Sequence, residues 1–416
     1  MIGTVIEDIA GRTYRVLREL GAGAEGTVYA VEDERTLVQM TVKVCDPTAI
    51  TPVTVPRLDA ICRLQLSAKS QAICAPICRL HDRHGVGVIQ PLANGVALST
   101  LLEQPSYSFQ DGIMIATALS RVLSRLEHLG VGHGDLAPNN IFAHRNGKHF
   151  EVYLIDLSNA VIPGAPKPTF LGQEYYLAPE VALTDSAPTL ESDRFAFATI
   201  VHLLLLLRHP FSAVPEANQD AASYLAFLKS ASWVEDPMAP RVVTQSVGRT
   251  VGVLSRDVQA LFRSALEVDP KRRPTFDQWT TRLETSLHNL HACDVCGQSF
   301  INEKTRVRCP CCLEPAPSYA FQVNGKSIPL SGTYTKVGRE EIGGDMTVSR
   351  EHVVFERQGF ALVVRCLSDN GIAVQTDRGW VELKRGEEVD LSPGASLRIA
   401  YGVEGAVCPI DANASP

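Results

Sequence analysis

The sequence lacks an apolar stretch long enough to cross a membrane. Its most apolar run, Phe195–Leu207, has 13 residues and includes His202, whereas a spanning helix needs about 20. The first residues carry Glu7 and Asp8, so they lack the basic start of a signal peptide, and they show no lipidation pattern. We therefore expect a soluble, cytoplasmic protein with no membrane partner.

The chain also lacks an excess of positive charge, low-complexity linkers and internal repeats. A formal net charge of −7 argues against a protein that a general positive field holds to nucleic acid, so nucleic acid is not an expected partner. With 45% hydrophobic and 20% charged residues, neither wholesale disorder nor a fibrous repeat fits. The 416 residues predict two to three domains at about 150 residues each.

The cysteines do not look like a disulfide framework. Their total of 11 is odd, five of them fall between positions 293 and 312, and the others are scattered among apolar residues. One dense cluster indicates a metal site in a reducing compartment.

The apolar pattern changes along the chain. Before residue 90, alternating segments predict strands at Tyr14–Leu20, Gly26–Glu32 and Val38–Val44. In the middle of the chain, apolar residues at helical spacing predict long helices: Gly112–Leu129, Asp193–Leu207 and Val258–Leu266. A segment rich in cysteine and proline follows, and alternating strands return after position 318.

Gly21, Gly23 and Gly26 form a G-x-G-x-x-G motif, which two unrelated folds use to approach phosphates. A dinucleotide-binding fold needs a helix to begin within the motif, but Thr27–Val31 has the composition of a strand. The motif therefore predicts a flexible turn between antiparallel strands whose backbone can approach phosphates. A glycine-rich hairpin without a ligand is the alternative. The rival Walker loop is absent, since Ala320 stands where its first glycine should be.

Four polar residues lie inside or directly beside apolar, strand-like segments. Lys43 lies within Met40–Val44, and because a buried ammonium is costly, an anion is expected nearby unless Lys43 lies at a strand edge. Asp135 and Asn140 are five residues apart, and Asp156 follows after one hairpin. Two oxygen-donor side chains can hold Mg²⁺ while a further carboxylate accepts a hydroxyl proton. Taken singly, these acids would more often be turn or cap residues.

Together, these motifs resemble the protein kinase family over residues 11–290. The resemblance makes Asp135 the catalytic base, with Asn140 and Asp156 as ligands of Mg²⁺. The residues that it assigns to ATP are Gly21, Gly23, Gly26, Val28 and Lys43.

Later motifs agree with this resemblance. Tyr176–Glu180 is similar to the family's A-P-E segment, and Asp193 opens an expected central helix that is apolar on all sides because it is buried. Arg273 is expected to pair with Glu180.

The predicted catalytic region departs from the family pattern in three ways. Gly134 stands where many kinases have an arginine that pairs with a phosphorylated activation loop. Ala137 stands where many have a lysine aimed at the γ-phosphate, and Leu157–Ser158 replaces the usual Phe-Gly after the metal-binding aspartate.

A fourth departure concerns the partner of Lys43. No glutamate lies at helical register after Lys43, and Asp59 is the nearest acid to the expected place, so we expect Asp59 to fill that role. In the short segment 156–180, Thr169 is a predicted self-phosphorylation site.

Two C-x-x-C pairs separated by twelve residues predict a metal site. Cys293, Cys296, Cys309 and Cys312 have the spacing of two knuckles around one tetrahedral ion, and four thiolates suit a structural Zn²⁺. Four unligated thiols are the alternative, and Cys311 is expected to be a bystander. The segment 291–316 resembles a zinc ribbon.

The C-terminal strands carry three polar marks at loop positions, around Arg339, Ser349 and Asn370. Arginine, serine and asparagine can converge on a phosphate and a peptide backbone. All three in this order resemble a forkhead-associated (FHA) domain, which binds phosphothreonine peptides. The resemblance implies that Arg339 and Ser349 hold the phosphate with help from Arg350, that Asn370 holds the peptide main chain, and that His352 braces the loop.

The sequence thus predicts an α+β two-lobed protein kinase fold followed by a small zinc ribbon and an all-β FHA sandwich. The expected domains are a kinase N-lobe (11–90), a kinase C-lobe (91–290), the zinc ribbon (291–316) and the FHA domain (318–416).

The expected function is transfer of the γ-phosphoryl group of MgATP to serine or threonine hydroxyls of protein substrates. A phosphothreonine-containing partner, or the chain's own phosphorylated segment, would bind the FHA domain. A pseudokinase scaffold is the first alternative, favoured by Ala137 and the missing helix glutamate. A nucleic-acid-binding regulator that works through the ribbon is the second, and the acidic balance disfavours it.

Overall fold

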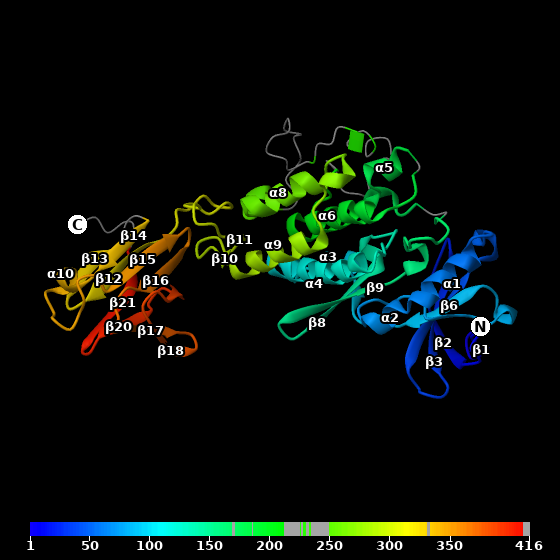
Figure 1. Ribbon diagram of the computed structural model, residues 1–416, viewed down its shortest axis with the longest axis horizontal. Helices are drawn as coiled ribbons and strands as arrows, with labels where there is room; N and C mark the ends of the chain where they lie inside the picture. The colour runs from blue at the N-terminus through cyan, green and yellow to red at the C-terminus, as the bar shows by residue number, and fades with distance from the viewer. Residues whose placement is uncertain are drawn as a thin grey trace. The chain divides into compact units, whose positions relative to one another are not determined.

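The chain folds into two compact units, Met1–His288 and Asn289–Pro416 (Figure 1). The structure is a computed structural model. It describes residues 1–168, 171–184, 186–211, 225, 228–229, 233, 249–330 and 333–410. Among these residues, no helix is long and apolar enough to span a membrane.

The first unit begins with an antiparallel six-stranded sheet in the order β1-β2-β3-β4-β6-β5. Its strands are β1 (Val5–Glu7), β2 (Thr13–Gly23), β3 (Gly26–Asp33), β4 (Gln39–Cys45), β5 (Cys78–Arg79) and β6 (Gly87–Pro91). The three strands expected before residue 90 are therefore confirmed. Alternation explains β2, because Tyr14 and Val16 are buried while Arg15 between them faces solvent.

One glycine is required where β3 starts. β3 pairs with β4 so closely that a Cβ on Gly26 would lie 2.1 Å from the carbonyl oxygen of Val44. Two helices follow β4 and pack beside the sheet, α1 (Thr54–Leu64) and α2 (Leu66–Lys69).

The rest of the first unit is mainly helical. Within the part of the chain that the structure describes, its α-helices are α3 (Leu98–Leu102), α4 (Phe109–His128), α5 (Pro179–Ala182), α6 (Leu190–Leu206), α8 (Arg256–Ala265) and α9 (Phe276–His288). Ser108 and Asp111 form a capping box at the start of α4, and Thr189 and Ser192 form one at the start of α6. A three-stranded sheet consists of β7 (Val96–Ala97), β8 (Ile141–Asn146) and β9 (His149–Leu154).

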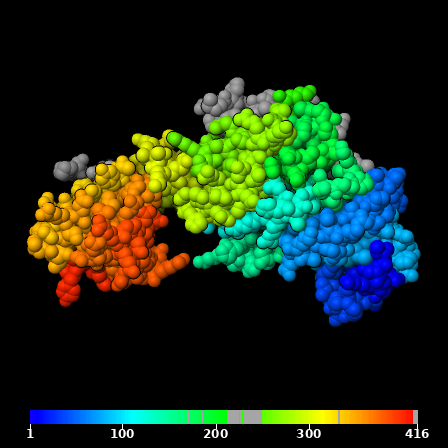
Figure 2. Space-filling view, viewed as in Figure 1, coloured from blue at the N-terminus to red at the C-terminus, as the bar shows by residue number. Residues whose placement is uncertain are grey.

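Helix α6 is the core of this part, as expected from its uniformly apolar sequence. Phe195, Phe197, Ile200 and Leu204 are all fully buried. In Figure 2 the surface of the N-terminal sheet, in blue, lies directly against the surface of the helical part, in cyan and green. The segments that carry the predicted site residues Lys43, Asp135 and Asp156 all belong to the first unit.

The second unit is built from strands. Two antiparallel sheets have the orders β13-β12-β21-β20-β17-β18 and β14-β15-β16-β19. The strands are β12 (Ser318–Val323), β13 (Lys326–Pro329), β14 (Tyr334–Val337), β15 (Val353–Gln358), β16 (Ala361–Cys366), β17 (Ile372–Thr376), β18 (Gly379–Leu383), β19 (Glu388–Leu391), β20 (Ser396–Ala400) and β21 (Val403–Ile410). One core takes residues from both sheets, including Phe321, Phe355 and Val374. The expected all-β domain is thus present, and its identity as an FHA domain stays a prediction.

A small cysteine-rich hairpin precedes these sheets within the same unit. Strands β10 (Leu290–Ala292) and β11 (Ser299–Ile301) pair with each other. Asn302, just after β11, donates to the carbonyl oxygen of Gln358 and accepts from the amide of Phe360. Phe300 packs edge-on against the Phe360 ring at 5.0 Å. The hairpin is therefore attached to the β domain by specific contacts.

Candidate active site

The loop between α4 and β8 is fixed by one buried carboxylate. Asp193, in the first turn of α6, accepts hydrogen bonds from the backbone amides of His133 (2.5 Å) and Gly134 (3.0 Å). Burial raises the pKa of Asp193 to about 7, although these two amides act in the opposite direction. The side chain of His133, also fully buried, contacts the carbonyl oxygen of Ile155 at 2.9 Å. These contacts tie the loop to α6 and to the end of β9.

Steric constraints explain why position 134 is a glycine. Its φ is +77°, and a Cβ there would lie 2.3 Å from the carbonyl oxygen of Asn159. An arginine, common at this place in kinases, therefore does not fit without a backbone shift.

Asp135 lies at the centre of the site, 8% exposed. Its Oδ2 accepts from the side-chain amide of Asn140 (3.0 Å) and its Oδ1 accepts from the backbone amide of Gln173 (3.0 Å). Burial, followed by the charge of Asp156, raises the pKa of Asp135 to about 7. A carboxyl group with such a pKa is suited to accept a proton near neutral pH.

Asn140 uses only its amide nitrogen in these contacts. That nitrogen also donates to the backbone oxygen of Asp135 at 2.8 Å. The amide oxygen of Asn140 is the atom that a cation would take. Asp156 follows β9 in a left-handed backbone conformation, with φ of +57°, and it supplies a second hard oxygen ligand of the type that Mg²⁺ prefers.

Lys43 on β4 is buried, and anionic partners lie beside it, as the sequence predicts. Its Nζ lies 2.7 Å from Oδ1 of Asp156 and 2.7 Å from Oε2 of Glu25. Burial alone lowers the pKa of Lys43, but these two carboxylates more than offset it, and the pKa is raised overall. Burial acts to raise the pKa of Asp156, but the charge of Lys43 and the hydrogen bonds from Lys43 and Ser158 together outweigh it, and the pKa of that carboxyl is lowered overall. Both groups are therefore charged at neutral pH.

The glycine-rich turn lies on the same sheet as Lys43. Gly21 pairs with Val28, and Val28 pairs with Lys43 on the next strand. A Cβ on Gly21 or Gly23 would meet no atom within 4 Å, so these two glycines leave space rather than fill it. The predicted ATP residues on β2 to β4 are thus brought together.

Asp59, which is predicted to act beside Lys43, does not contact it. It lies on α1, but its carboxylate accepts from Nε of Arg79 at 2.6 Å and is not a partner of Lys43. The expectation that Asp59 takes the place of the usual glutamate is therefore wrong in this geometry, because α1 turns Asp59 toward β5. Arg57 of α1 instead donates to the carbonyl oxygens of Ser158 (3.4 Å) and Ala160 (2.8 Å).

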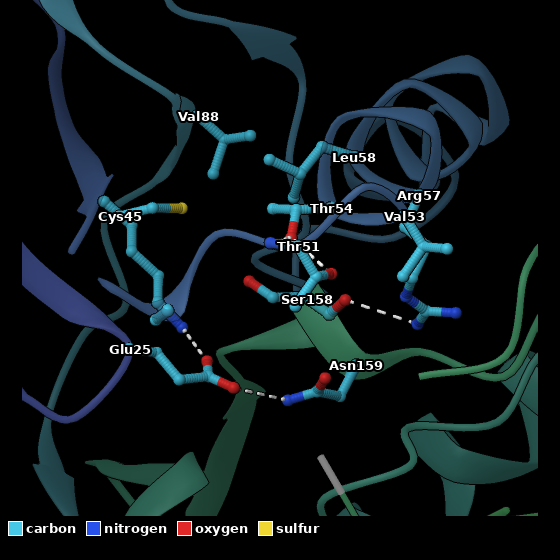
Figure 3. Close-up of a pocket in the computed structure, with 12 residues that line it drawn as sticks. Glu25, Cys45, Thr51, Val53, Thr54, Arg57, Leu58, Val88, Ser158 and Asn159 are labelled. Atoms are coloured by element: carbon cyan, nitrogen blue, oxygen red, sulfur yellow. Dashed lines mark hydrogen bonds and ion pairs between the residues drawn. The ribbon is translucent and has the colours of Figure 1, made fainter. Parts of the chain in front are cut away.

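Sequence reasoning missed three residues of this site: Glu25, Arg57 and Asn159. All three line a small cavity of about 70 Å³ beside Lys43 (Figure 3). Glu25 is an acid inside an otherwise small-residue glycine loop, which is the one signal that could have marked it. Nothing in the sequence distinguishes Asn159 or Arg57.

The segment after Asp156 ends on a confirmed ion pair. Arg273, whose side chain is fully buried, makes two hydrogen bonds of 2.7 Å to the two carboxylate oxygens of Glu180. It also lies over the ring of Phe195. Thr169, the predicted modification site, lies outside the described residues.

The four predicted metal-ligating cysteines also come together. Their sulfur atoms all lie within 4.8 Å of one another, with Cys293 and Cys312 at 3.7 Å and Cys296 and Cys309 at 3.8 Å. A tetrahedral ZnS₄ site with bonds of about 2.3 Å requires sulfur atoms about 3.8 Å apart. The donor set and its spacing therefore fit Zn²⁺. Cys311 is exposed and lies outside the cluster.

The predicted phosphopeptide-binding residues Arg339, Ser349 and Asn370 lie on adjoining loops of the β domain. Arg339 opens α10 (Arg339–Ile342), and its Nε donates to the carbonyl oxygen of Val348 at 2.9 Å. The hydroxyl groups of Ser349 and Ser368 are 2.9 Å apart, and Ser368 accepts from the backbone amide of Asn370. These contacts bring the loops that carry Arg339, Ser349 and Asn370 together.

His352 braces this region from inside. It is fully buried, accepts from the backbone amide of Ser349 (3.0 Å) and contacts the carbonyl oxygen of Gly371 (3.3 Å). Arg350 follows Ser349 in the chain and is exposed. A Cβ on Gly338 would lie 1.8 Å from the carbonyl oxygen of Arg350, so only glycine allows the two loops to approach.

The comparisons with known proteins concern the first unit. Residues 14–282 match the family described as protein kinase domain, and the chain belongs to that family. It is similar to calcium-dependent protein kinase 9 of Oryza sativa subsp. japonica, with 28% identity over 272 residues, which cover 64% of this chain and 44% of that protein.

Two further relatives come from an animal and a bacterium. The ovarian-specific serine/threonine-protein kinase Lok of Drosophila melanogaster is 25% identical over 283 residues, covering 64% of this chain and 55% of Lok. Protein kinase YegI of Escherichia coli (strain K12) is 24% identical over 304 residues, covering 67% of this chain and 45% of YegI. The matches thus span 44% to 55% of these relatives.

Proposed function

We propose that this protein kinase transfers the γ-phosphoryl group of MgATP to serine or threonine hydroxyls of protein substrates. The observation that carries the proposal is the convergence of Lys43, Asp135, Asn140 and Asp156, with Asp135 held at a pKa of about 7. Serine and threonine are favoured over tyrosine because Lok, one of the relatives, is named a serine/threonine-protein kinase.

The contacts of each residue support its proposed role. Lys43, held by Asp156, would bind phosphate oxygens, and Asn140 and Asp156 would hold Mg²⁺ through side-chain oxygens. Bound MgATP would supply the phosphoryl group, and its Mg²⁺ would neutralise negative charge that develops during transfer. Asp135 orients the substrate hydroxyl and accepts its proton at Oδ, while Asn140 and Gln173 fix the carboxylate.

Intact-mass spectrometry after incubation with MgATP tests this function. Protein expressed with a phosphatase gives the baseline, and each added phosphate increases the mass by about 80 Da. We expect additions on the parent or on a generic protein substrate. Asp135→Asn should remove them, whereas Asp377→Asn, at an exposed turn of the β domain, should not.

Absence of any transfer would instead support the pseudokinase scaffold. Ala137 and the engagement of Asp59 by Arg79 favour that second candidate. In that case the chain would act through binding alone.

We further propose that the β domain is an FHA domain that binds phosphothreonine, either in a partner or in the chain's own phosphorylated segment. The adjoining loops of Arg339, Ser349 and Asn370 support this proposal. A phosphothreonine peptide library should be retained over the matching threonine library, and Arg339→Ala should reduce retention at least tenfold, because a charged hydrogen-bond donor is lost. Arg378→Ala, on an exposed hairpin turn, is the matched control.

The cysteine cluster is proposed to hold one structural Zn²⁺. Among the described residues every cysteine is free of disulfide bonds, and thiolate clusters of this kind suit a reducing compartment. We therefore propose the cytoplasm as the location.

A further inference from the structure

Lys43 has no acidic partner on the helix that borders its pocket. The only acid on α1 is Asp59, and Arg79 occupies its carboxylate. On the side of α1 that lines the cavity are Thr54, Arg57 and Leu58, none of which is an anion. A buried ammonium that must bind phosphates needs a fixed anion besides Asp156, because Asp156 is also a metal ligand in the proposed function.

The glycine-rich turn supplies such an anion. Glu25 lies between β2 and β3, and its Oε2 is 2.7 Å from Nζ of Lys43. Its other oxygen, Oε1, accepts from the side-chain amide of Asn159 at 3.0 Å, a contact drawn in Figure 3. Both oxygens of the carboxylate are therefore engaged by residues of the candidate site.

Asn159 connects Glu25 to the segment that follows Asp156. It is 7% exposed and lies in the 3₁₀ turn Leu157–Asn159, directly after Asp156. Its backbone oxygen packs against Gly134 of the catalytic loop. Glu25 therefore links the glycine-rich turn to Lys43 and to the segment that carries the metal ligand.

We propose that Glu25 is the positioning residue for Lys43, in the role that the sequence led us to seek on α1. This inference rests on the proposed function and deepens it. Glu25 contacts Lys43 through one carboxylate oxygen and Asn159 through the other. The orientation of Lys43 is thus coupled to the glycine-rich turn and to the segment after Asp156, whereas an acid on α1 would couple Lys43 to the helix.

If Glu25 instead inhibited nucleotide binding, the expected result would be different. A carboxylate 2.7 Å from Lys43 could compete with phosphate for the same ammonium. Removing its charge would then tighten nucleotide binding, whereas removing a positioning residue weakens it.

The test uses the full chain, four single variants and one double variant. Glu25→Gln removes the charge, Glu25→Asp keeps it on a shorter side chain, and Asn159→Ala removes the second contact. Glu19→Gln removes an exposed charge from the neighbouring part of β2 and is the control. The readouts are the affinity for MgADP by calorimetry, kcat and KM for ATP measured separately, and the melting temperature.

We expect Glu25→Gln to weaken MgADP binding about 5- to 10-fold and to lower kcat/KM about 10- to 100-fold, the range for loss of one charge-assisted hydrogen bond. Glu25→Asp should recover part of both, and Glu19→Gln should match the parent. Asn159→Ala should act in the same direction. Combined with Glu25→Gln it should add little, because both changes break one linkage.

Unchanged or tighter MgADP binding by Glu25→Gln would overturn the inference, as would full additivity with Asn159→Ala. A parent that binds MgADP but transfers no phosphate would contradict the proposed function alone, since the binding measurements still test Glu25. A parent that binds no MgADP would overturn both.

Discussion

The ionisation of one side chain should govern the pH dependence of this protein. Burial first, and then the charge of Asp156, raise the pKa of Asp135 to about 7. A base must be deprotonated to act, so activity is lost as pH falls through that value. We expect kcat/KM to decrease about tenfold per pH unit below about 7. Initial rates between pH 5.5 and 8.5 measure this, and a flat profile down to pH 5.5 would contradict it.

The stability of the first unit should depend on the backbone conformation of a single glycine, Gly134. Gly134→Ala places a Cβ 2.3 Å from the carbonyl oxygen of Asn159 at a φ of +77°. We expect it to destabilise the kinase unit by about 2–4 kcal/mol, measured by thermal unfolding. Gly147→Ala is the matched control, because its φ is +59° but no atom lies within 4 Å of the added Cβ. Equal losses in both variants would show that backbone strain alone decides.

The contact between α5 and the turn before α9 depends on a buried ion pair. Arg273→Ala removes both hydrogen bonds to Glu180 and the contact with Phe195. Because Glu180 then loses its partner, the expected loss of unfolding free energy is about 3–5 kcal/mol. The neighbouring Arg272→Ala breaks an exposed pair with Glu267 and should cost about 1 kcal/mol or less. Denaturant unfolding of both variants provides the comparison, and similar losses would argue against a structural role for the buried pair.

Metal removal should affect the second unit and spare the first. Elemental analysis should find one zinc per chain, and chelation should increase hydrogen exchange over 290–316. The increase should extend to the turn at Gly359 and Phe360, since Asn302 and Phe300 contact it. Cys309→Ser should reproduce the effect, while Cys311→Ser, whose thiol lies outside the cluster, should retain the metal. Retention of zinc by Cys309→Ser would contradict the four-thiolate site.

Much of the architecture could be predicted because its signals are local. Alternation with a period of two marks β2, β3 and β4, and an apolar run without a polar face marks the buried helix α6. The C-x-x-C spacing determines the four-sulfur cluster, because each pair of thiols converges through its own short turn. The pairing of Arg273 with Glu180 followed from the family resemblance and is confirmed.

The partner of Lys43 could not be predicted in this way. Sequence distance favoured Asp59, but which side chain α1 presents to the pocket depends on how the helix is rotated against β5, where Arg79 takes the carboxylate. The residues alone therefore determined the elements, their order and the chemistry of the ligands. Only the tertiary structure decided that a carboxylate from the glycine-rich turn reaches the lysine, because that contact joins three segments far apart in the chain.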